Sequence, residues 1–111
     1  MLKKYLNKIV NVKIDRAINT KHPKHNFIYE LNYGFLPNTV SGDGEEIDAY
    51  ILDVLEPLEE FSGEVIAIIH RLNDVEDKLV VAPKEHKKCT KEEILQKVNF
   101  QEKFFKSEII M

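Results

Sequence analysis

The segment Gly63–Leu72, with the sequence GEVIAIIHRL, decides the fold class of this chain. Its uninterrupted apolar run, Val65–Ile69, is short enough to be a single buried strand. In Lys8–Asp15, before it, apolar and polar residues alternate, which is typical of a half-buried strand. Three other stretches have extended patterns, the last two ending close to prolines: Phe27–Tyr33, Ile47–Leu55 and Leu79–Ala82. Short strands therefore occupy most of the chain up to Pro83.

A helical pattern begins at Thr90. Thr90 and Glu93 have the spacing of a capping box, in which two side chains satisfy free amides at the start of a helix. We expect the helix to fray or break near Asn99. The apolar residues at roughly helical spacing are Ile94, Leu95, Val98, Phe104 and Phe105. Several strands followed by one helix predict a mainly β (α+β) protein, either a small antiparallel barrel or a curled sheet, with the helix packed on it.

The composition favours a single folded domain over residues 1–111, with 43% hydrophobic and 32% charged residues. We expect a cytoplasmic protein, because the chain has neither an apolar run long enough for a bilayer nor the pattern of a signal peptide. Sixteen basic and nineteen acidic residues give a net charge of −3, which argues against duplex nucleic acid as a partner. Cys89 is the one cysteine, so an intramolecular disulfide is excluded.

Two acidic groups are the candidate site. In the first, Asp43 and Glu45 share one face if the segment is extended, and Asp48 needs a bend to join them. The second contains Asp74, Glu76 and Asp77. Two carboxylates about 4 Å apart repel by about 4 kcal/mol at an effective dielectric of about 20, so clustering them requires protons or cations. Hard oxygen ligands suit Mg²⁺, Mn²⁺ or Ca²⁺. The alternative is that both groups are solvated turns that do not meet.

Two motifs resemble those of family I soluble inorganic pyrophosphatases. Residues 32–39, NYGFLPNT, followed by residues 43–49, DGEEIDA, resemble the Asn-Tyr-Gly-Phe and Asp-Gly-Asp-Pro-hydrophobic-Asp signatures of that family. Residues 76–83, EDKLVVAP, look like its second metal-binding stretch. The resemblance implies a small five-stranded closed barrel of the oligonucleotide-binding type, with the C-terminal helix packed on it.

The resemblance also implies roles for individual residues. Glu45 takes the place of the central aspartate that helps to activate the attacking water, with Asp43 beside it, while Tyr33 lines the site. Lys78 binds phosphate, and Lys106 follows Phe105, which lacks the hydroxyl of the family's tyrosine. Mg²⁺, with Mn²⁺ as a possible substitute, is the implied cofactor, and its implied ligands are Asp43, Glu45, Asp48, Asp74 and Glu76.

The chain departs from the family between the first strand and Asn32, where there is no room for a hairpin that carries three site residues. Lys13 stands where the first strand of the family supplies a glutamate. Arg71, after a buried strand, either joins the site or simply emerges into water. The substitutes expected for the missing phosphate ligands are Arg16, Lys21, His22, Lys24 and His25.

The expected function is metal-dependent hydrolysis of a phosphoanhydride, most simply pyrophosphate to two phosphates. Catalytic roles fall to Glu45, Asp43 and Lys78, and substrate binding to Arg16, Lys21, Tyr33, Lys78 and Lys106. One alternative is a larger phosphoanhydride or phosphate ester as substrate, because the missing hairpin would open the pocket. Another is a metal-dependent phosphate or nucleotide binder without hydrolysis. The expected partner is a small phosphate-containing substrate, not nucleic acid or a membrane, and a homo-oligomer stays open.

Overall fold

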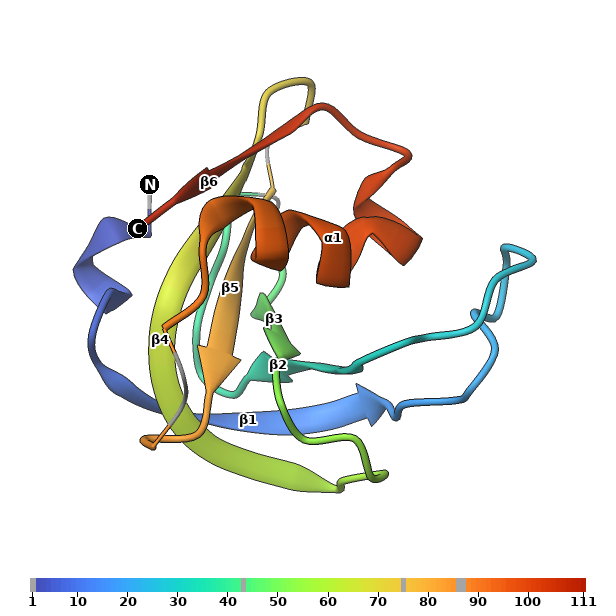
Figure 1. Ribbon diagram of the computed structural model, residues 1–111, viewed down its shortest axis with the longest axis horizontal. Coiled ribbons are helices and arrows are strands. Elements are labelled where there is room, and N and C mark those ends of the chain that lie inside the picture. Colours follow the sequence, from blue (N-terminus) through green and yellow to red (C-terminus); the bar gives the residue numbers. More distant parts are fainter. Residues whose placement is uncertain (1, 43, 75, 86–87) are drawn as a thin grey trace.

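Five strands close into a barrel in the computed structural model, which describes residues 2–42, 44–74, 76–85 and 88–111 (Figure 1). The order around the barrel is β1-β2-β3-β5-β4, and β4 returns to β1. The β3–β5 pair is parallel and the other pairs are antiparallel, so the barrel is mixed. The strands are β1 (Ile9–Arg16), β2 (Asn32–Leu36), β3 (Ile47–Ile51), β4 (Glu60–Arg71) and β5 (Asp77–Ala82), after a short 3-10 helix, η1 (Lys3–Tyr5). The closed barrel is confirmed, whereas the antiparallel arrangement predicted from the sequence is wrong for β3 and β5, which pair in parallel.

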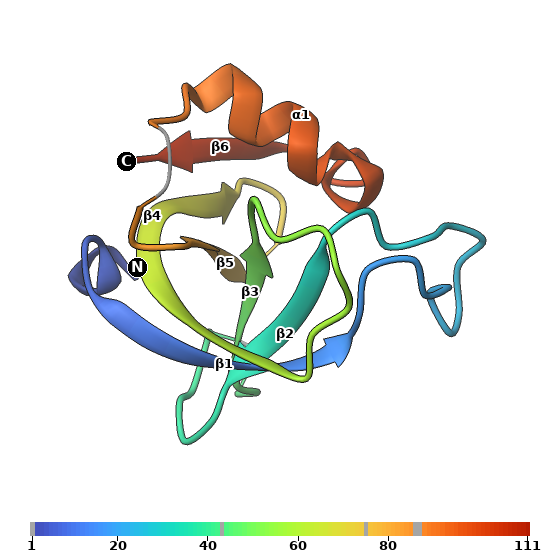
Figure 2. The same cartoon turned by 60° about the horizontal axis from the view of Figure 1, so that its bottom comes forward.

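The long strand β4 bends around the barrel and has different neighbours along its length. Its first half pairs with β1, from Lys13 opposite Glu60 to Ile9 opposite Glu64. Its second half pairs with a sixth strand, β6 (Ser107–Ile110), which lies outside the barrel beside α1 (Figure 2). β4 begins three residues earlier than the pattern of Gly63–Leu72 predicts.

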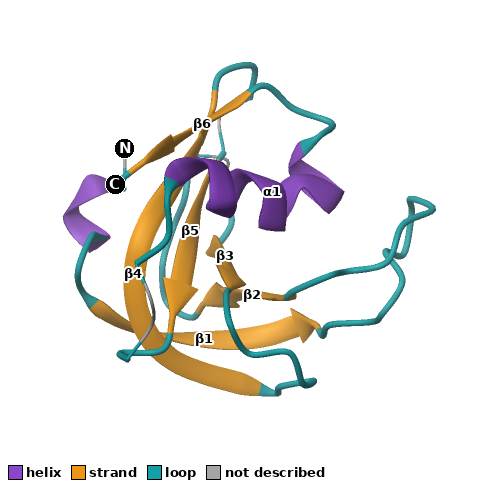
Figure 3. Ribbon diagram, in the orientation of Figure 1, coloured by secondary structure: helices purple, strands orange, loops and turns teal. Residues whose placement is uncertain are grey.

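The helix α1 (Lys91–Glu102) covers the outside of the barrel (Figure 3). Its capping box is confirmed, because Thr90 and Glu93 exchange both hydrogen bonds at 3.1 Å. The prediction of a break near Asn99 and of helix through Phe105 is wrong: the helix continues to Glu102 and stops there. Backbone hydrogen bonds between residues three apart form the next turn, including one from Phe105 N to Glu102 O at 2.9 Å. The chain then leaves α1 and pairs with β4 as β6.

Two hydrophobic clusters explain the apolar run of β4. Side chains that point into the barrel, such as Val65, Ile68 and Leu79, form one cluster. Alternate side chains on the outer face, such as Ile69, pack with Ile94 of α1 in the other. Both faces of β4 are therefore covered, and a strand buried on both sides has no polar alternation.

Smaller differences concern the ends of other strands. β3 ends at Ile51, earlier than the predicted Leu55. β2 begins only at Asn32, so most of the predicted extended stretch Phe27–Tyr33 belongs to a long loop that projects from the barrel. This loop is pinned by an isolated bridge between Lys21 and Ile28. No helix in the described part of the chain is long and apolar enough to cross a membrane.

β1 and β2 cross very closely at Gly34. A Cβ atom there would lie 1.9 Å from the carbonyl oxygen of Lys13, so no larger residue fits without moving the backbone. The glycine of the NYGF motif therefore sets the distance between these two strands.

Candidate functional site

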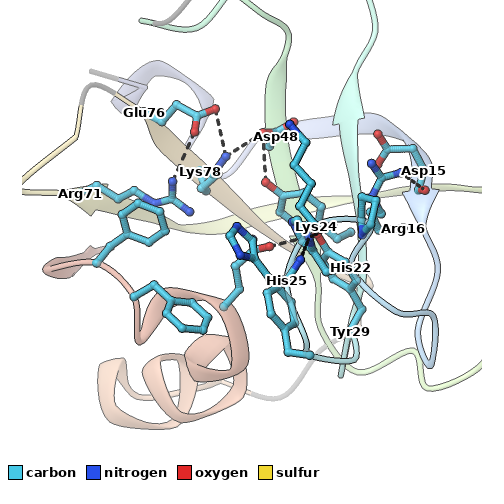
Figure 4. Close-up of a pocket in the computed structure, with 16 residues that line it drawn as sticks. Asp15, Arg16, His22, Lys24, His25, Tyr29, Asp48, Arg71, Glu76 and Lys78 are labelled. Atoms are coloured by element: carbon cyan, nitrogen blue, oxygen red, sulfur yellow. Dashed lines mark hydrogen bonds and ion pairs between the residues drawn. The ribbon is translucent and has the colours of Figure 1, made fainter.

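A pocket of about 650 Å³ lies where the loop after β1, the barrel and the end of α1 meet (Figure 4). Its charged and polar lining comes from the five barrel strands, from Glu76 just before β5, from the loop after β1 and from Gln101 of α1. The loop and the segment after α1 add aromatic lining. The lining residues are Asp15, Arg16, His22, Pro23, Lys24, His25, Phe27, Tyr29, Tyr33, Asp48, Arg71, Glu76, Lys78, Gln101, Phe104 and Phe105.

Lys78, at the start of β5, joins the two predicted acidic groups. Its Nζ lies 2.7 Å from Oδ2 of Asp48 on β3 and 3.1 Å from Oε1 of Glu76. Tyr33 donates a hydrogen bond to the same Asp48 oxygen at 3.0 Å. The lysine is only 2% exposed, and a buried ammonium requires such partners. Asp48 and Glu76, one from each acidic group, therefore meet through Lys78.

Tyr33 is a fixed donor to this cluster. Burial raises the pKa of its phenol well above the ordinary value, and the nearby charge of Asp48 raises it further. The hydroxyl therefore keeps its proton at neutral pH and continues to donate to the carboxylate.

Arg71, the last residue of β4, is held under the pocket by a buried carboxylate. Its Nε and Nη2 donate to the two oxygens of Glu102 at 3.0 and 2.7 Å, while Nη1 lies 3.3 Å from Glu76. The ring of Phe105 packs against the guanidinium, with Cζ of Arg71 3.6 Å from the ring centroid. Burial alone would lower the pKa of Arg71, but hydrogen bonding and charge attraction to Glu102 raise it. Arg71 is thus a permanent cation of the pocket, and only 4% exposed.

Glu102 is in turn the centre of a polar network beneath the pocket. Tyr50 donates to its Oε2 at 2.6 Å, and Ser107 to its Oε1 at 3.0 Å. Gln101 links Tyr50 to Tyr29, with bonds of 2.6 and 3.0 Å. Burial would raise the pKa of Glu102, but the hydrogen bonds from Arg71 and Tyr50 outweigh it and lower the pKa. The carboxylate therefore stays charged at neutral pH.

The loop after β1 contributes the opposite wall of the pocket. The backbone amides of Lys24 and His25 donate to Nδ1 of His22 at 3.0 and 3.1 Å, so this ring shapes the loop tip. Loss of water around His22 lowers its pKa, and the neighbouring His25, Arg16 and Lys24 lower it further. A neutral His22 accepting these amides leaves the positive charge of this wall to Arg16 and Lys24.

Asp15 is an acidic pocket residue that sequence reasoning missed. Partial loss of water raises the pKa of its carboxyl although Asp15 is an exposed residue, Arg16 lowers the pKa, and Asp48 raises it again. The register of β1 and β2 shifts between Ile14 and Arg16, which turns consecutive residues toward the pocket. Alternation along the strand gave no signal of this irregularity. The acidic pocket residue of β1 is therefore Asp15, whereas Lys13 is not among the described lining residues.

The remaining predicted residues lie around or outside this centre. Asp43 lies outside the described residues. Among the described lining residues, the other predicted residues Glu45, Asp74, Lys21 and Lys106 do not occur. Glu45 is exposed on the turn before β3, and Asp74 reaches Nη1 of Arg71 at 3.4 Å. The structure adds Asp15 to the predicted residues that it brings together, which are Arg16, His22, Lys24, His25, Tyr33, Asp48, Arg71, Glu76 and Lys78.

The donor chemistry suits a hard cation, although Lys78 stands between its two carboxylates. In the part of the chain that is described, no three acidic, histidine or cysteine side chains are grouped as a metal would need. Asp48 and Glu76 nevertheless offer only oxygen atoms, which Mg²⁺ and Mn²⁺ prefer. Both also share the Lys78 ammonium, which shows that this position favours positive charge.

A closed mixed barrel with a pocket that holds four basic and three acidic side chains defines a small barrel protein suited to an anionic ligand. The sequence model of the inorganic pyrophosphatase family matches residues 5–109, so the chain belongs to that family. No match was found among curated proteins.

Solved structures of bacterial proteins share the fold at low identity. A Coxiella burnetii inorganic pyrophosphatase has a TM-score of 0.68 and 15% identity, over 94% of this chain and 84% of that one. An Ehrlichia chaffeensis inorganic pyrophosphatase has a TM-score of 0.59 and 21% identity, over 71% and 62% of the chains. An Anaplasma phagocytophilum inorganic phosphatase gives 0.55 and 21%, over 68% and 56%. The matched region thus spans less than two thirds of the last two proteins.

Proposed function

We propose that the protein hydrolyses pyrophosphate to two phosphates in the pocket around Lys78. The observation that carries this proposal is the buried Lys78 ammonium between Asp48 and Glu76, in a pocket where Arg16, Lys24 and Arg71 add positive charge. Such fixed cations stabilise the charge that develops on phosphate oxygens during phosphoryl transfer. Family membership gives the same substrate class.

The reaction requires water to attack one phosphorus while the bridging P–O bond breaks, and a base to accept the proton of the water. Two carboxylates are candidates for that base. Glu45 has the role by resemblance, together with Asp43. Asp15 has it by position, because it lines the pocket and its pKa is raised toward that of an effective base.

The proposal includes a divalent ion, Mg²⁺ or Mn²⁺, held by Asp48 and Glu76 with the predicted ligands Asp43, Glu45 and Asp74. When bound, the ion would neutralise phosphate oxygens and lower the pKa of water. Lys78 would bind the phosphate oxygens of the substrate, and Tyr33 would keep Asp48 oriented through its hydrogen bond. We also propose that Lys21 and Lys106 bind phosphate at the edge of the pocket. The proposed location of the protein is the cytoplasm.

The test is steady-state phosphate release from pyrophosphate with Mg²⁺ and with Mn²⁺. Removing a positioned base costs about 10² to 10⁴ in rate. Glu45→Gln and Asp15→Asn are therefore compared, and the one that causes this loss identifies the base. Glu46→Gln is the matched control, because it removes a neighbouring exposed carboxylate that does not line the described pocket.

Absence of pyrophosphate hydrolysis in the unmodified protein would contradict the proposal. The alternative of a binder without hydrolysis would then be tested by the thermal shift that a non-hydrolysable pyrophosphate analogue produces. Its supporting observation is that Phe105, which packs on Arg71, has no hydroxyl to offer a phosphate.

A further inference from the structure

The pocket extends beyond its charged centre to a wall of aromatic rings. His25 and Phe27 are nearly parallel, with centroids 6.4 Å apart and an interplanar angle of 7°. His25 and Phe104 are 6.3 Å apart and tilted by 27°, and Phe27 lies 5.9 Å from Phe104. The loop after β1 and the segment after α1 thus build this aromatic wall, His25, Phe27 and Phe104, together.

Packing of the loop against α1 explains the position of Phe27 but not that of the other two rings. Phe27 contacts Tyr29 and the buried Phe100, which anchor the loop on the helix. Phe104 lines the pocket and yet remains 58% exposed, and His25 is exposed as well. Two rings that line the pocket with exposed surface are available for stacking with a planar ligand.

The size of the pocket supports a ligand larger than pyrophosphate. A volume of about 650 Å³ lies within the range of roughly 300–1,000 Å³ that is typical of sites for drug-sized molecules. Figure 4 shows His22 and His25 opposite Glu76 and Lys78, with Lys24 beside them. Aromatic surface and phosphate-binding cations therefore line one continuous cavity.

We propose that this pocket recognises a nucleoside polyphosphate, with the base stacked on the aromatic wall and the phosphates near Lys24, Arg16 and Lys78. The binding of the phosphates in this inference rests on the proposed function, whereas the stacking of the base rests on the rings of Phe104 and His25. A nucleoside di- or triphosphate has the one flat apolar end and the one multiply charged end that the cavity requires. The aromatic wall selects it over phosphoanhydrides that lack a base.

The test is isothermal titration in Mg²⁺ buffer with two ligands that cannot be hydrolysed at the bridge. One is the α,β-methylene analogue of ADP, and the other is the methyl ester of methylenediphosphonate, which keeps the phosphates and lacks the nucleoside. We expect the ADP analogue to bind at least about fivefold more tightly, since base stacking on an aromatic side chain contributes roughly 1–3 kcal/mol, and 1.4 kcal/mol is tenfold.

Phe104→Leu keeps an apolar side chain and removes the ring, so it should reduce this preference about fivefold, whereas Phe104→Tyr should retain it. His25→Ala is a second variant with the same expected direction. Tyr5→Leu removes a ring that is not among the described lining residues and packs against the cluster inside the barrel, so it should leave the preference unchanged. Equal affinity of the unmodified protein for both ligands, or an unchanged preference in both Phe104→Leu and His25→Ala, would overturn the inference.

Measuring pyrophosphate hydrolysis with the same protein preparations tests the proposed function separately from nucleotide binding. Hydrolysis without any preference for the nucleoside would refute the aromatic site alone. A ring-dependent preference without hydrolysis would support the aromatic site and contradict the hydrolase. If neither ligand binds, the inference is wrong.

Discussion

Replacing Glu102 by glutamine tests the buried network beneath the pocket. The carboxylate accepts bonds from Arg71 Nε, Arg71 Nη2, Tyr50 and Ser107, and it is 2% exposed. Breaking a buried ion pair from one side costs roughly 3–5 kcal/mol. Glutamine keeps the volume and one acceptor oxygen, so we expect a loss of about 3 kcal/mol, at the lower end of that range. Arg71 would be left with the more exposed Glu76 and Asp74.

The loss can be measured by thermal and urea unfolding at neutral pH. For a domain of this size, 1 kcal/mol corresponds to roughly 4–8 °C, so Tm should fall by about 12–24 °C. Glu92→Gln removes an exposed carboxylate from the same helix and should change the free energy of unfolding by only about 0.5 kcal/mol.

Two results would refute this reasoning. A loss below about 1 kcal/mol would mean that the charge of Glu102 does not hold Arg71. A double variant, Glu102→Gln with Arg71→Met, should lose less than the sum of the two single losses, because removing both charges leaves none unpaired. Simple additivity would show that the two side chains act independently.

Three further predictions follow from other features. Folding lowers the pKa of Glu102 from 4.5, so the stability contributed by its carboxylate is complete above about pH 4.5 and is lost as the pH falls through the lowered pKa. Between pH 7 and pH 3, Tm should therefore drop more steeply in the unmodified protein than in Glu102→Gln. Gly34→Ala should cost about 3 kcal/mol or more in urea unfolding, because its Cβ meets backbone, whereas Gly44→Ala, in open space at φ 85°, should cost roughly 1–2 kcal/mol. Mg²⁺ at a hundredfold excess over Kd should add about 2.7 kcal/mol of stability, seen as a rise in Tm, and an undiminished rise in Asp48→Asn would show that the ion binds elsewhere.

Much of the fold was predictable because local patterns and tertiary structure agree. The alternation of Lys8–Asp15 and the capping box at Thr90 correspond directly to β1 and α1. β6 was missed because Ser107–Ile110 is short and directly follows apolar residues at helical spacing. Its extended conformation depends on pairing with β4, which no local pattern reveals.

The site was predictable where a motif stays in register with a strand. Asp48 and Lys78 lie on β3 and β5, which are paired, and the parallel pairing brings both toward one pocket. Asp15 depends on a register shift, and the role of Arg71 on a partner 31 residues away, Glu102. Neither the register shift nor the contact with Glu102 produces a regular spacing of residues that could be recognised in a single sequence.

The division of β4 between β1 and β6 imposes an order on folding during synthesis. The barrel can close once β5 has left the ribosome, since β1, β2 and β3 precede it in the chain. The outer face of β4 and β5, with Ile69 and Val80, stays uncovered until α1 and β6 have been made. A ribosome-bound chain whose barrel closes at that stage would carry a bare apolar flank, and such a surface is prone to aggregation until α1 and β6 cover it.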